Sequence, residues 1–276
     1  MKKIGFIDYY ISEWHANNYP AWIKNACAKL GLDYEIAYAW AEQDISPVDG
    51  VSTDEWCEKM GVTRCASIEE LCQKADYLLI LAPSNPEKHL GYAKVALRYG
   101  KRTYIDKTFA PDYATAKEIF DIAKENGTSF FSTSALRYAD EIENRLSSTA
   151  ITTTGGGSNL PEYIVHQAEM VVKTLGLGAK SVCAKKTGDL ITLAVNYDDE
   201  RYAVMNYAPS LPFTVMTTKD GQTEYRAVAS DFFGTLMNQI VMFYDTGVLP
   251  FDENETLEVM KIREMAVNKY EQLIKE

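Results

Sequence analysis

Long apolar runs, paired cysteines and clustered basic residues are all missing from this sequence of 276 residues. No apolar run approaches the ~20 residues that a membrane-spanning helix needs. Met1-Lys2-Lys3 leads directly into a strand-like segment and not into the apolar segment of a signal peptide. These absences predict a soluble, cytoplasmic protein without a membrane partner.

The cysteines are odd in number and contain no C-x-x-C pair. This usage predicts reduced, packed thiols, with no disulfide framework and no metal site. The formal net charge of −11 leaves no broad basic face, so binding of nucleic acid is not expected. The sequence also has no internal repeat and no low-complexity tract.

The first half of the chain alternates short apolar runs with longer segments of helical period. Strands are predicted at residues 3–7, 34–39, 77–82, 102–105 and 129–131, and helices at residues 15–30, 68–73, 87–99 and 113–125. Strand, helix and strand in this order require right-handed crossovers. Residues 1–133 therefore predict a Rossmann-like domain with a doubly wound parallel sheet, whose ligand crevice lies beyond the carboxyl ends of the strands.

The second half has a different rhythm. Residues 152–158 predict a turn-rich connection, because three threonines are followed there by three glycines and a serine. One helix is predicted at residues 160–175, strands at 179–186, 190–197, 202–208 and 213–218, and two closing helices at 230–246 and 255–275. Residues 134–276 therefore predict an α+β domain with a mainly antiparallel sheet.

The turn after the first strand lacks the glycines of a dinucleotide fingerprint. Asp8, Tyr10 and Glu13 stand at the three positions of G-x-G-x-x-G. A carboxylate about 5 Å from a phosphate charge costs roughly 3 kcal/mol at an effective dielectric constant of about 20. Two interpretations stay open: the acidic residues oppose a bound phosphate, or they cap the first helix.

Three further segments carry chemistry. Residues 75–85 form an apolar strand that ends in Pro83-Ser84-Asn85, with His89 following, and residues 100–108 form a short strand that ends in Asp106-Lys107. In residues 160–169, Glu162, His166 and Glu169 are spaced by four and three residues, which places them on one face of a helix.

Together these segments resemble the Gfo/Idh/MocA family, oxidoreductases that act on sugars and other polyols with a nicotinamide cofactor. The closing residues 243–250 are also similar to the family pattern. Two positions depart from it. Thr108 stands where the family has a proline that shapes the turn after the lysine, and Trp40 stands where an acidic residue binds the ribose.

The resemblance implies a set of site residues. The implied catalytic residues are Lys107, His166 and Glu162. The implied contacts with NAD or NADP are Asp8, Tyr10, Ile11, Trp40, Pro83, Asn85, His89 and Asp106. The implied contacts with a sugar-like small molecule are Arg137, Tyr138 and Glu169. The resemblance further implies a homodimer or tetramer that forms through the C-terminal sheet.

In the implied mechanism, His166 takes a proton from a substrate hydroxyl, Lys107 polarises the same oxygen, and the nicotinamide accepts the hydride. Structural roles remain open for the other histidines, His15 and His89, and surface roles for the substrate set. A competing hypothesis is a non-redox descendant of the fold that binds a small ligand and has lost dinucleotide binding. The residues at the glycine positions and Trp40 favour it.

Overall fold

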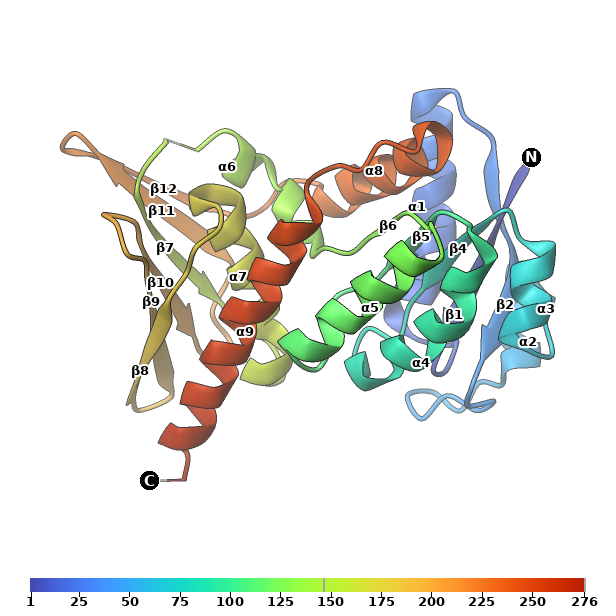
Figure 1. Ribbon diagram of the computed structural model, residues 1–276, viewed down its shortest axis with the longest axis horizontal. Coiled ribbons are helices and arrows are strands. Elements are labelled where there is room, and N and C mark those ends of the chain that lie inside the picture. The colour runs from blue at the N-terminus through green and yellow to red at the C-terminus, as the bar shows by residue number, and fades with distance from the viewer. Residues whose placement is uncertain (146, 276) are drawn as a thin grey trace. The chain divides into compact units, whose positions relative to one another are not determined.

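A computed structural model describes residues 1–145 and 147–275. The chain forms two compact units, one made of Met1–Thr133 with Gly234–Pro250, the other of Ser134–Phe233 with Phe251–Glu276. Figure 1 labels their elements along the chain. Each unit has its own sheet and its own buried core.

The first unit contains the parallel sheet that the sequence predicts. Its strand order is β3-β2-β1-β4-β5-β6, and every pairing is parallel. The strands are β1 (Lys2–Asp8), β2 (Tyr34–Ala41), β3 (Thr63–Arg64), β4 (Tyr77–Ile80), β5 (Thr103–Ile105) and β6 (Phe130–Phe131). The strand order turns around between β1 and β4, which is where the ligand crevice of such a sheet forms.

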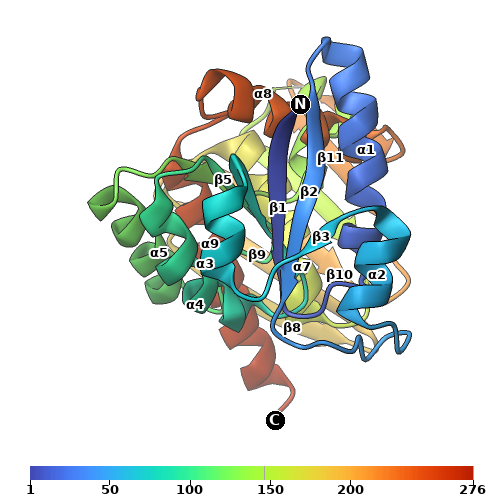
Figure 2. The same cartoon turned by 90° about the vertical axis from the view of Figure 1, so that its right-hand side faces the viewer.

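Helices cover both faces of this sheet. They are α1 (Trp14–Leu30), α2 (Thr53–Met60), α3 (Ile68–Lys74), α4 (Pro86–Ala96), followed by the turn η1 (Leu97–Tyr99), and α5 (Tyr113–Glu125). In Figure 2, α1 and α2 lie on one side of β1 and β2, and α3, α4 and α5 lie on the other. A side chain at Gly5 would meet Leu71 of α3 at 2.4 Å, so glycine allows this helix to approach β1 closely. Helix α2 and strand β3 are additions to the predicted elements.

Helix α8 (Phe232–Thr246) corrects the predicted division at residue 134, because Gly234–Pro250 belongs to the first unit. The ring of Tyr244 stacks on Tyr77 at 4.9 Å, and its hydroxyl donates to the carbonyl oxygen of Leu78 over 2.6 Å. Phe243 packs edge-on against Phe131 at 5.2 Å. These aromatic side chains complete the core beside β4 and β6, which the first 133 residues leave open.

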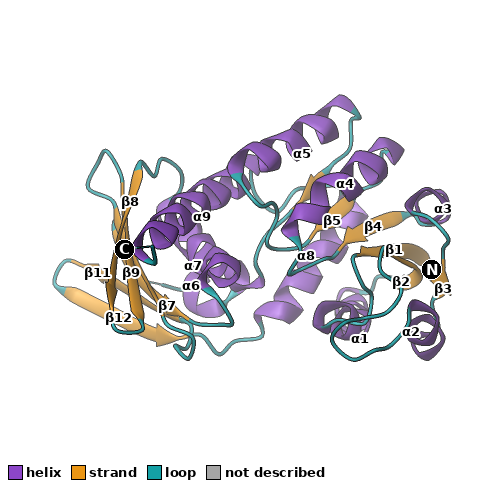
Figure 3. Cartoon of the chain, turned by 90° about the horizontal axis from the view of Figure 1, so that it is seen from below, coloured by secondary structure: helices purple, strands orange, loops and turns teal. Residues whose placement is uncertain are grey.

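The second unit contains the mixed, mostly antiparallel sheet that was expected. Its strand order is β12-β11-β7-β10-β9-β8. The strands are β7 (Ala150–Gly155), β8 (Ser181–Thr187), β9 (Leu190–Asn196), β10 (Tyr202–Tyr207), β11 (Thr214–Lys219) and β12 (Gln222–Ala227). Helices α7 (Leu160–Leu175) and α9 (Glu253–Leu273) pack on one face of this sheet, with the short η2 (Ala135–Tyr138) and α6 (Asp140–Glu143) preceding β7 (Figure 3).

Strand β7 shows that the predicted connection at residues 152–158 was wrong over its first half. This stretch provides a central strand, which pairs parallel to β10 and antiparallel to β11. Thr153 is fully buried and donates its hydroxyl to Gln167 of α7 over 2.7 Å. Threonine is β-branched and favours strands, and its hydroxyl is satisfied here by a long-range partner that local sequence does not reveal.

The β11–β12 hairpin turns at Asp220 and Gly221, which lie between the paired residues Lys219 and Gln222. Asp220 and Gly221 both have positive φ, 51° and 76°. A two-residue hairpin turn with both φ values positive matches the twist of the strands that it joins. Among the described residues, no helix is both long and apolar enough to cross a membrane.

Candidate functional site

The candidate residues fall into two groups, one in each unit. The first group follows β1, β4 and β5 at their carboxyl ends, and the second lies on η2 and α7. Each group combines buried and partly exposed side chains.

Glu13 is the N-cap of α1. Its Oε2 accepts a hydrogen bond from the backbone nitrogen of His15 over 2.8 Å, and its Oε1 accepts one from the backbone nitrogen of Ala16. Only 6% of the residue is exposed. The capping interpretation of Glu13 is therefore confirmed, and its carboxylate takes the amide groups that a helix N-terminus would otherwise offer to a phosphate.

Asp8 does not cap the helix. Its Oδ1 accepts hydrogen bonds from the backbone nitrogens of Tyr9, over 2.7 Å, and Ala82, over 2.9 Å, which ties the end of β1 to the segment after β4. Its Oδ2 is buried and has no hydrogen-bond partner in the described chain. Burial, followed by the nearby charge of Glu13, raises the pKa of Asp8 well above its usual value.

His15 bridges the start of α1 and the end of β5. Its Nδ1 lies 3.1 Å from Oε2 of Glu13, and its Nε2 lies 3.7 Å from Oδ2 of Asp106. The hydroxyl groups of Tyr19 and Tyr104 each donate to Oδ1 of Asp106 over 3.2 Å. We call Asp8, Glu13, His15 and Asp106 the acidic corner of the first unit.

Lys107 follows Asp106 at the carboxyl end of β5 and is partly exposed. Its Nζ donates to the carbonyl oxygen of Pro83 over 3.3 Å, which joins the segments after β4 and β5. The peptide bond between Lys107 and Thr108 is cis. An ammonium group has three donors, and in the described part of the chain this hydrogen bond uses one of them.

His89 is completely buried and acts as an internal brace. Its Nδ1 lies 2.9 Å from the carbonyl oxygen of Phe109, and its Nε2 lies 2.5 Å from that of Leu81. Burial lowers its pKa. Each ring nitrogen lies within hydrogen-bond distance of a carbonyl oxygen, which suits a structural role, and the implied contact with a cofactor remains a prediction.

The other implied cofactor residues line the same carboxyl ends. Ile11 and Pro83 are buried, while Tyr10, Trp40 and Asn85 are partly exposed. The ring of Trp40 meets that of Tyr92 edge-on at 5.7 Å.

Glu42 is a residue that the sequence analysis missed. It directly follows β2, and its Oε2 accepts from the Tyr92 hydroxyl over 2.7 Å while Oε1 pairs with Lys88 at 2.5 Å. Hydrogen bonding from Lys88 lowers the pKa of Glu42. It is the acid nearest in sequence to the expected ribose position, and the signal was its place two residues after Trp40.

His166 projects from α7 in the second unit and is partly exposed. Its Nδ1 lies 2.7 Å from Oγ of Ser134, and its ring meets that of Phe213 edge-on at 5.6 Å. Gln167 anchors this turn of α7 to the sheet through hydrogen bonds to Gly155 and Asn206. The contact with Ser134 orients the imidazole ring, a group that can exchange a proton with a ligand near neutral pH.

Glu169 contacts the backbone of Ser134, and Arg137 pairs with Glu169. Oε2 of Glu169 accepts from the backbone nitrogen of Ser134 over 3.2 Å, and its Oε1 pairs with Arg137 at 2.8 Å. Arg137 also pairs with Glu255 and lies 3.9 Å from the ring centre of Phe251. Burial acts to lower the pKa of Arg137, but the two carboxylates raise it above its usual value. Arg137 and Glu169 are 3% and 2% exposed, which suits side chains that orient their neighbours, and the implied contacts with a substrate remain a prediction.

Tyr138 and Glu162 take different positions. The hydroxyl of Tyr138 is buried without a hydrogen-bond partner in the described chain, and burial raises its pKa. Glu162 belongs to the start of α7, where its backbone nitrogen donates to Asn159 over 2.9 Å and its carboxylate accepts from the Asn159 amide over 3.2 Å. This capping contact gives Glu162 a structural role, and the implied catalytic role remains a prediction.

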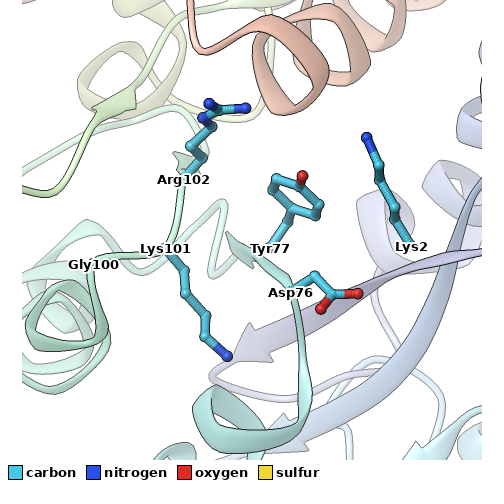
Figure 4. A pocket seen from close by; sticks show the side chains of 6 residues that line it. All are labelled: Lys2, Asp76, Tyr77, Gly100, Lys101 and Arg102. Carbon is cyan, nitrogen blue, oxygen red and sulfur yellow. The ribbon is translucent and has the colours of Figure 1, made fainter.

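One pocket, of ≈ 450 Å³, lies at the amino ends of the strands of the first sheet, opposite the candidate residues at their carboxyl ends (Figure 4). In the figure, Arg102, Tyr77 and Lys2 extend the same way and Lys101 extends away from them. Arg102 donates to the carbonyl oxygen of Tyr244 over 2.5 Å, and Lys2 pairs with Asp245 at 2.8 Å. These cations fasten the C-terminal end of α8, where positive charge is favourable.

Among the described residues, no group of three or more potential ligands is arranged to hold a metal ion. The acidic corner also fails as a pyrophosphate cradle, because Glu13 occupies the α1 amides and Asp8 adds a buried carboxyl group. The residues present at this corner therefore do not fit the phosphates of a dinucleotide in the usual manner.

Comparisons with known proteins agree with the fold. A family model described as "Oxidoreductase family, NAD-binding Rossmann fold", GFO_IDH_MocA, matches residues 42–134. The match begins after the turn that follows β1, where the fingerprint glycines are absent. The "Uncharacterized oxidoreductase YhhX" of Escherichia coli (strain K12) is 36% identical over 62 residues, which is 22% of this chain and 18% of that protein. The chain thus spans less than a fifth of the curated relative that it matches.

Solved structures resemble the chain over nearly its whole length. UDP-N-acetylglucosamine 3-dehydrogenase from Acidithiobacillus ferrooxidans has a TM-score of 0.74 at 12% identity, covering 97% of this chain and 96% of that one. Biliverdin reductase from Synechocystis sp. PCC 6803, in complex with biliverdin and NADP+, has a TM-score of 0.71 at 14% identity, covering 97% and 98%. At such identities the likeness establishes the fold alone.

Proposed function

We propose that this chain is an oxidoreductase of the Gfo/Idh/MocA type, which catalyses oxidation or reduction at a hydroxyl-bearing carbon of a small, sugar-like or polyol molecule. The observation that carries the proposal is the pair of candidate proton-handling groups. His166 is held at Nδ1 by Ser134, and Lys107 stands at the carboxyl end of β5. A dehydrogenase related in fold acts on a UDP-sugar, which supports the substrate class.

In this proposal His166 accepts the hydroxyl proton at Nε2, and the Lys107 ammonium stabilises the negative charge that develops on the oxygen. NAD or NADP is the redox partner that the family implies. For this chain's own residues we assign only the transfer of the hydroxyl proton. We assign no residues to the binding of the dinucleotide, because the acidic corner does not fit a pyrophosphate.

Glu169 and Arg137 are proposed as positioning residues. Glu169 holds the backbone of Ser134, whose hydroxyl fixes the His166 ring, and Arg137 keeps the Glu169 carboxylate in place. The implied substrate contacts of these two residues give way to this role because both are buried.

A non-redox, ligand-binding protein is the second candidate function. The specific observation in its favour is the acidic corner, where Asp8 and Glu13 stand in place of phosphate-binding glycines. For either function, we propose that the protein is cytoplasmic.

Titration of the purified chain with NADH and with NADPH, followed by nicotinamide fluorescence, tests the two candidates. Saturation at micromolar concentration, together with NADH formation from NAD and one member of a panel of sugars and polyols, supports the oxidoreductase. Absence of binding at millimolar dinucleotide contradicts it and supports the second candidate.

We also propose that the chain self-associates through the face of the second sheet opposite α7 and α9. One row of residues crosses the sheet on that face in register: Cys183, Ala194, Val204, Thr152, Met216 and Tyr225. None of these side chains is charged, and Tyr225 is 64% exposed. A flat row of this composition is suited to burial against a second copy.

Val204→Lys is expected to convert the oligomer to a monomer, because an ammonium group at the middle of the row would be buried without a partner. Size-exclusion chromatography with light scattering measures the mass. The matched control is Val48→Lys, since Val48 is 70% exposed in the first unit. A monomeric native chain, or equal masses for both variants, would contradict the interface.

A further inference from the structure

The carboxylate of Glu13 occupies the backbone amides at the start of α1. Glu13 accepts hydrogen bonds from the backbone nitrogens of His15 and Ala16 and is almost completely buried. These are amides of the first helical turn, the groups that bind the pyrophosphate in a dinucleotide fold. A bound pyrophosphate and the Glu13 carboxylate therefore compete for the same donors.

A second, independent observation lies beside Glu13. The buried Asp8 has an oxygen with no hydrogen-bond partner in the described chain, and its carboxyl group interacts electrostatically with Glu13 and Asp106. His15 is the basic group seen between Glu13 and Asp106. The corner thus gathers three carboxyl groups where an incoming phosphate brings further negative charge.

We propose that Glu13 acts as a built-in substitute for the phosphate and is the residue that determines how tightly this chain binds a dinucleotide. The inference rests on the proposed function, because it assumes that the crevice of the first unit is a nucleotide site. Binding of the pyrophosphate requires the Glu13 side chain to leave the α1 amides, and the neighbouring Asp8 adds to the cost.

The displacement has a structural consequence inside the same unit. Glu13 also holds Nδ1 of His15, whose Nε2 faces Asp106, the residue before Lys107. When Glu13 leaves, His15 keeps Asp106 as its acidic neighbour. The start of α1 and the end of β5 are therefore connected through one imidazole ring.

Two variants separate charge from occupancy. Glu13→Gln removes the negative charge and keeps an oxygen that can accept from the amides, whereas Glu13→Gly removes both the charge and the occupant. The dissociation constant for NADH, measured by nicotinamide fluorescence, is expected to fall at least about tenfold in Glu13→Gly and by less in Glu13→Gln. Calorimetry with inorganic pyrophosphate is expected to rank the three proteins in the same way, with Glu13→Gly binding most tightly, then Glu13→Gln, then the native chain.

The matched control is Asp112→Asn, which changes the acidic N-cap of α5 in the same unit, where Asp112 accepts from the backbone nitrogen of Thr115 over 2.7 Å. This control is expected to leave both dissociation constants unchanged. If Glu13→Gly fails to fold, as judged by circular dichroism, Glu13→Gln alone tests the inference.

The outcomes distinguish the inference from the proposed function. Equal, micromolar NADH binding by the native chain and both variants overturns the inference and leaves the proposed function in place. Tighter binding of pyrophosphate by the variants, without turnover of any polyol, supports the inference and contradicts the proposed function. Absence of binding of NADH and pyrophosphate by every form overturns both.

Discussion

His166→Ala is expected to lower kcat/KM for hydroxyl oxidation by about 10²- to 10⁴-fold, the usual contribution of a positioned general base. The variant removes the proton acceptor that Ser134 orients, and the partly exposed ring contributes little to the core. Steady-state kinetics on the substrate found in the polyol panel measure the loss. Urea denaturation verifies that the fold is retained.

Lys107→Met is also expected to lower kcat/KM. It keeps the length of the side chain and removes the charge that stabilises the substrate oxygen. Its matched control is Lys117→Met on the exposed surface of α5. The control is expected to retain the native rate. Native rates for both His166→Ala and Lys107→Met would show that proton transfer at these residues is not part of the reaction.

Arg137→Ala is expected to lower the free energy of unfolding by about 3–5 kcal/mol, the range observed when one partner of a buried ion pair is removed. The guanidinium group is 3% exposed and pairs with both Glu169 and Glu255. Its removal leaves the Glu169 carboxylate buried without its cation. Urea denaturation near pH 7 measures the change.

Arg226→Ala provides the comparison, because the ion pair of Arg226 with Glu224 lies at the surface and is expected to contribute at most about 1 kcal/mol. The double variant Arg137→Met with Glu169→Leu is expected to recover most of the lost stability, since the fully buried pair becomes apolar and Glu255, which also loses its partner, is partly exposed. A loss in Arg137→Ala no larger than that in Arg226→Ala would contradict the assignment of a buried, structural ion pair.

The elements of the first unit could be predicted because their signals are local. Alternating apolar runs and helical periods placed the strands β1, β2, β4 and β5 and the helices α1, α3, α4 and α5 to within a few residues. The cap of α1 at Glu13, one of the two interpretations left open by the sequence, depends on backbone groups within three positions of that residue. Such contacts are encoded in neighbouring residues.

The errors occurred where distant residues decide the outcome. Residues 152–155 were predicted as a connection and form β7, because Thr153 finds Gln167 and the strand finds β10 and β11 as partners. Helix α8 was placed in the second domain, but Tyr244 and Phe243 pack in the core of the first. No local pattern distinguishes these partners from others.

The candidate site divides in the same way. The sequence by itself determined which chemical groups are available: the acidic residues at the glycine positions, the lysine after β5, and the Glu-His-Glu spacing on α7. Only the tertiary structure decided their uses. It made Glu13 a helix cap, buried Glu169 against Arg137, and placed Ser134, the N-cap of η2, beside His166. The physical reason is that hydrogen bonds and burial depend on which segments pack together, whereas the identity and spacing of side chains are fixed along the chain.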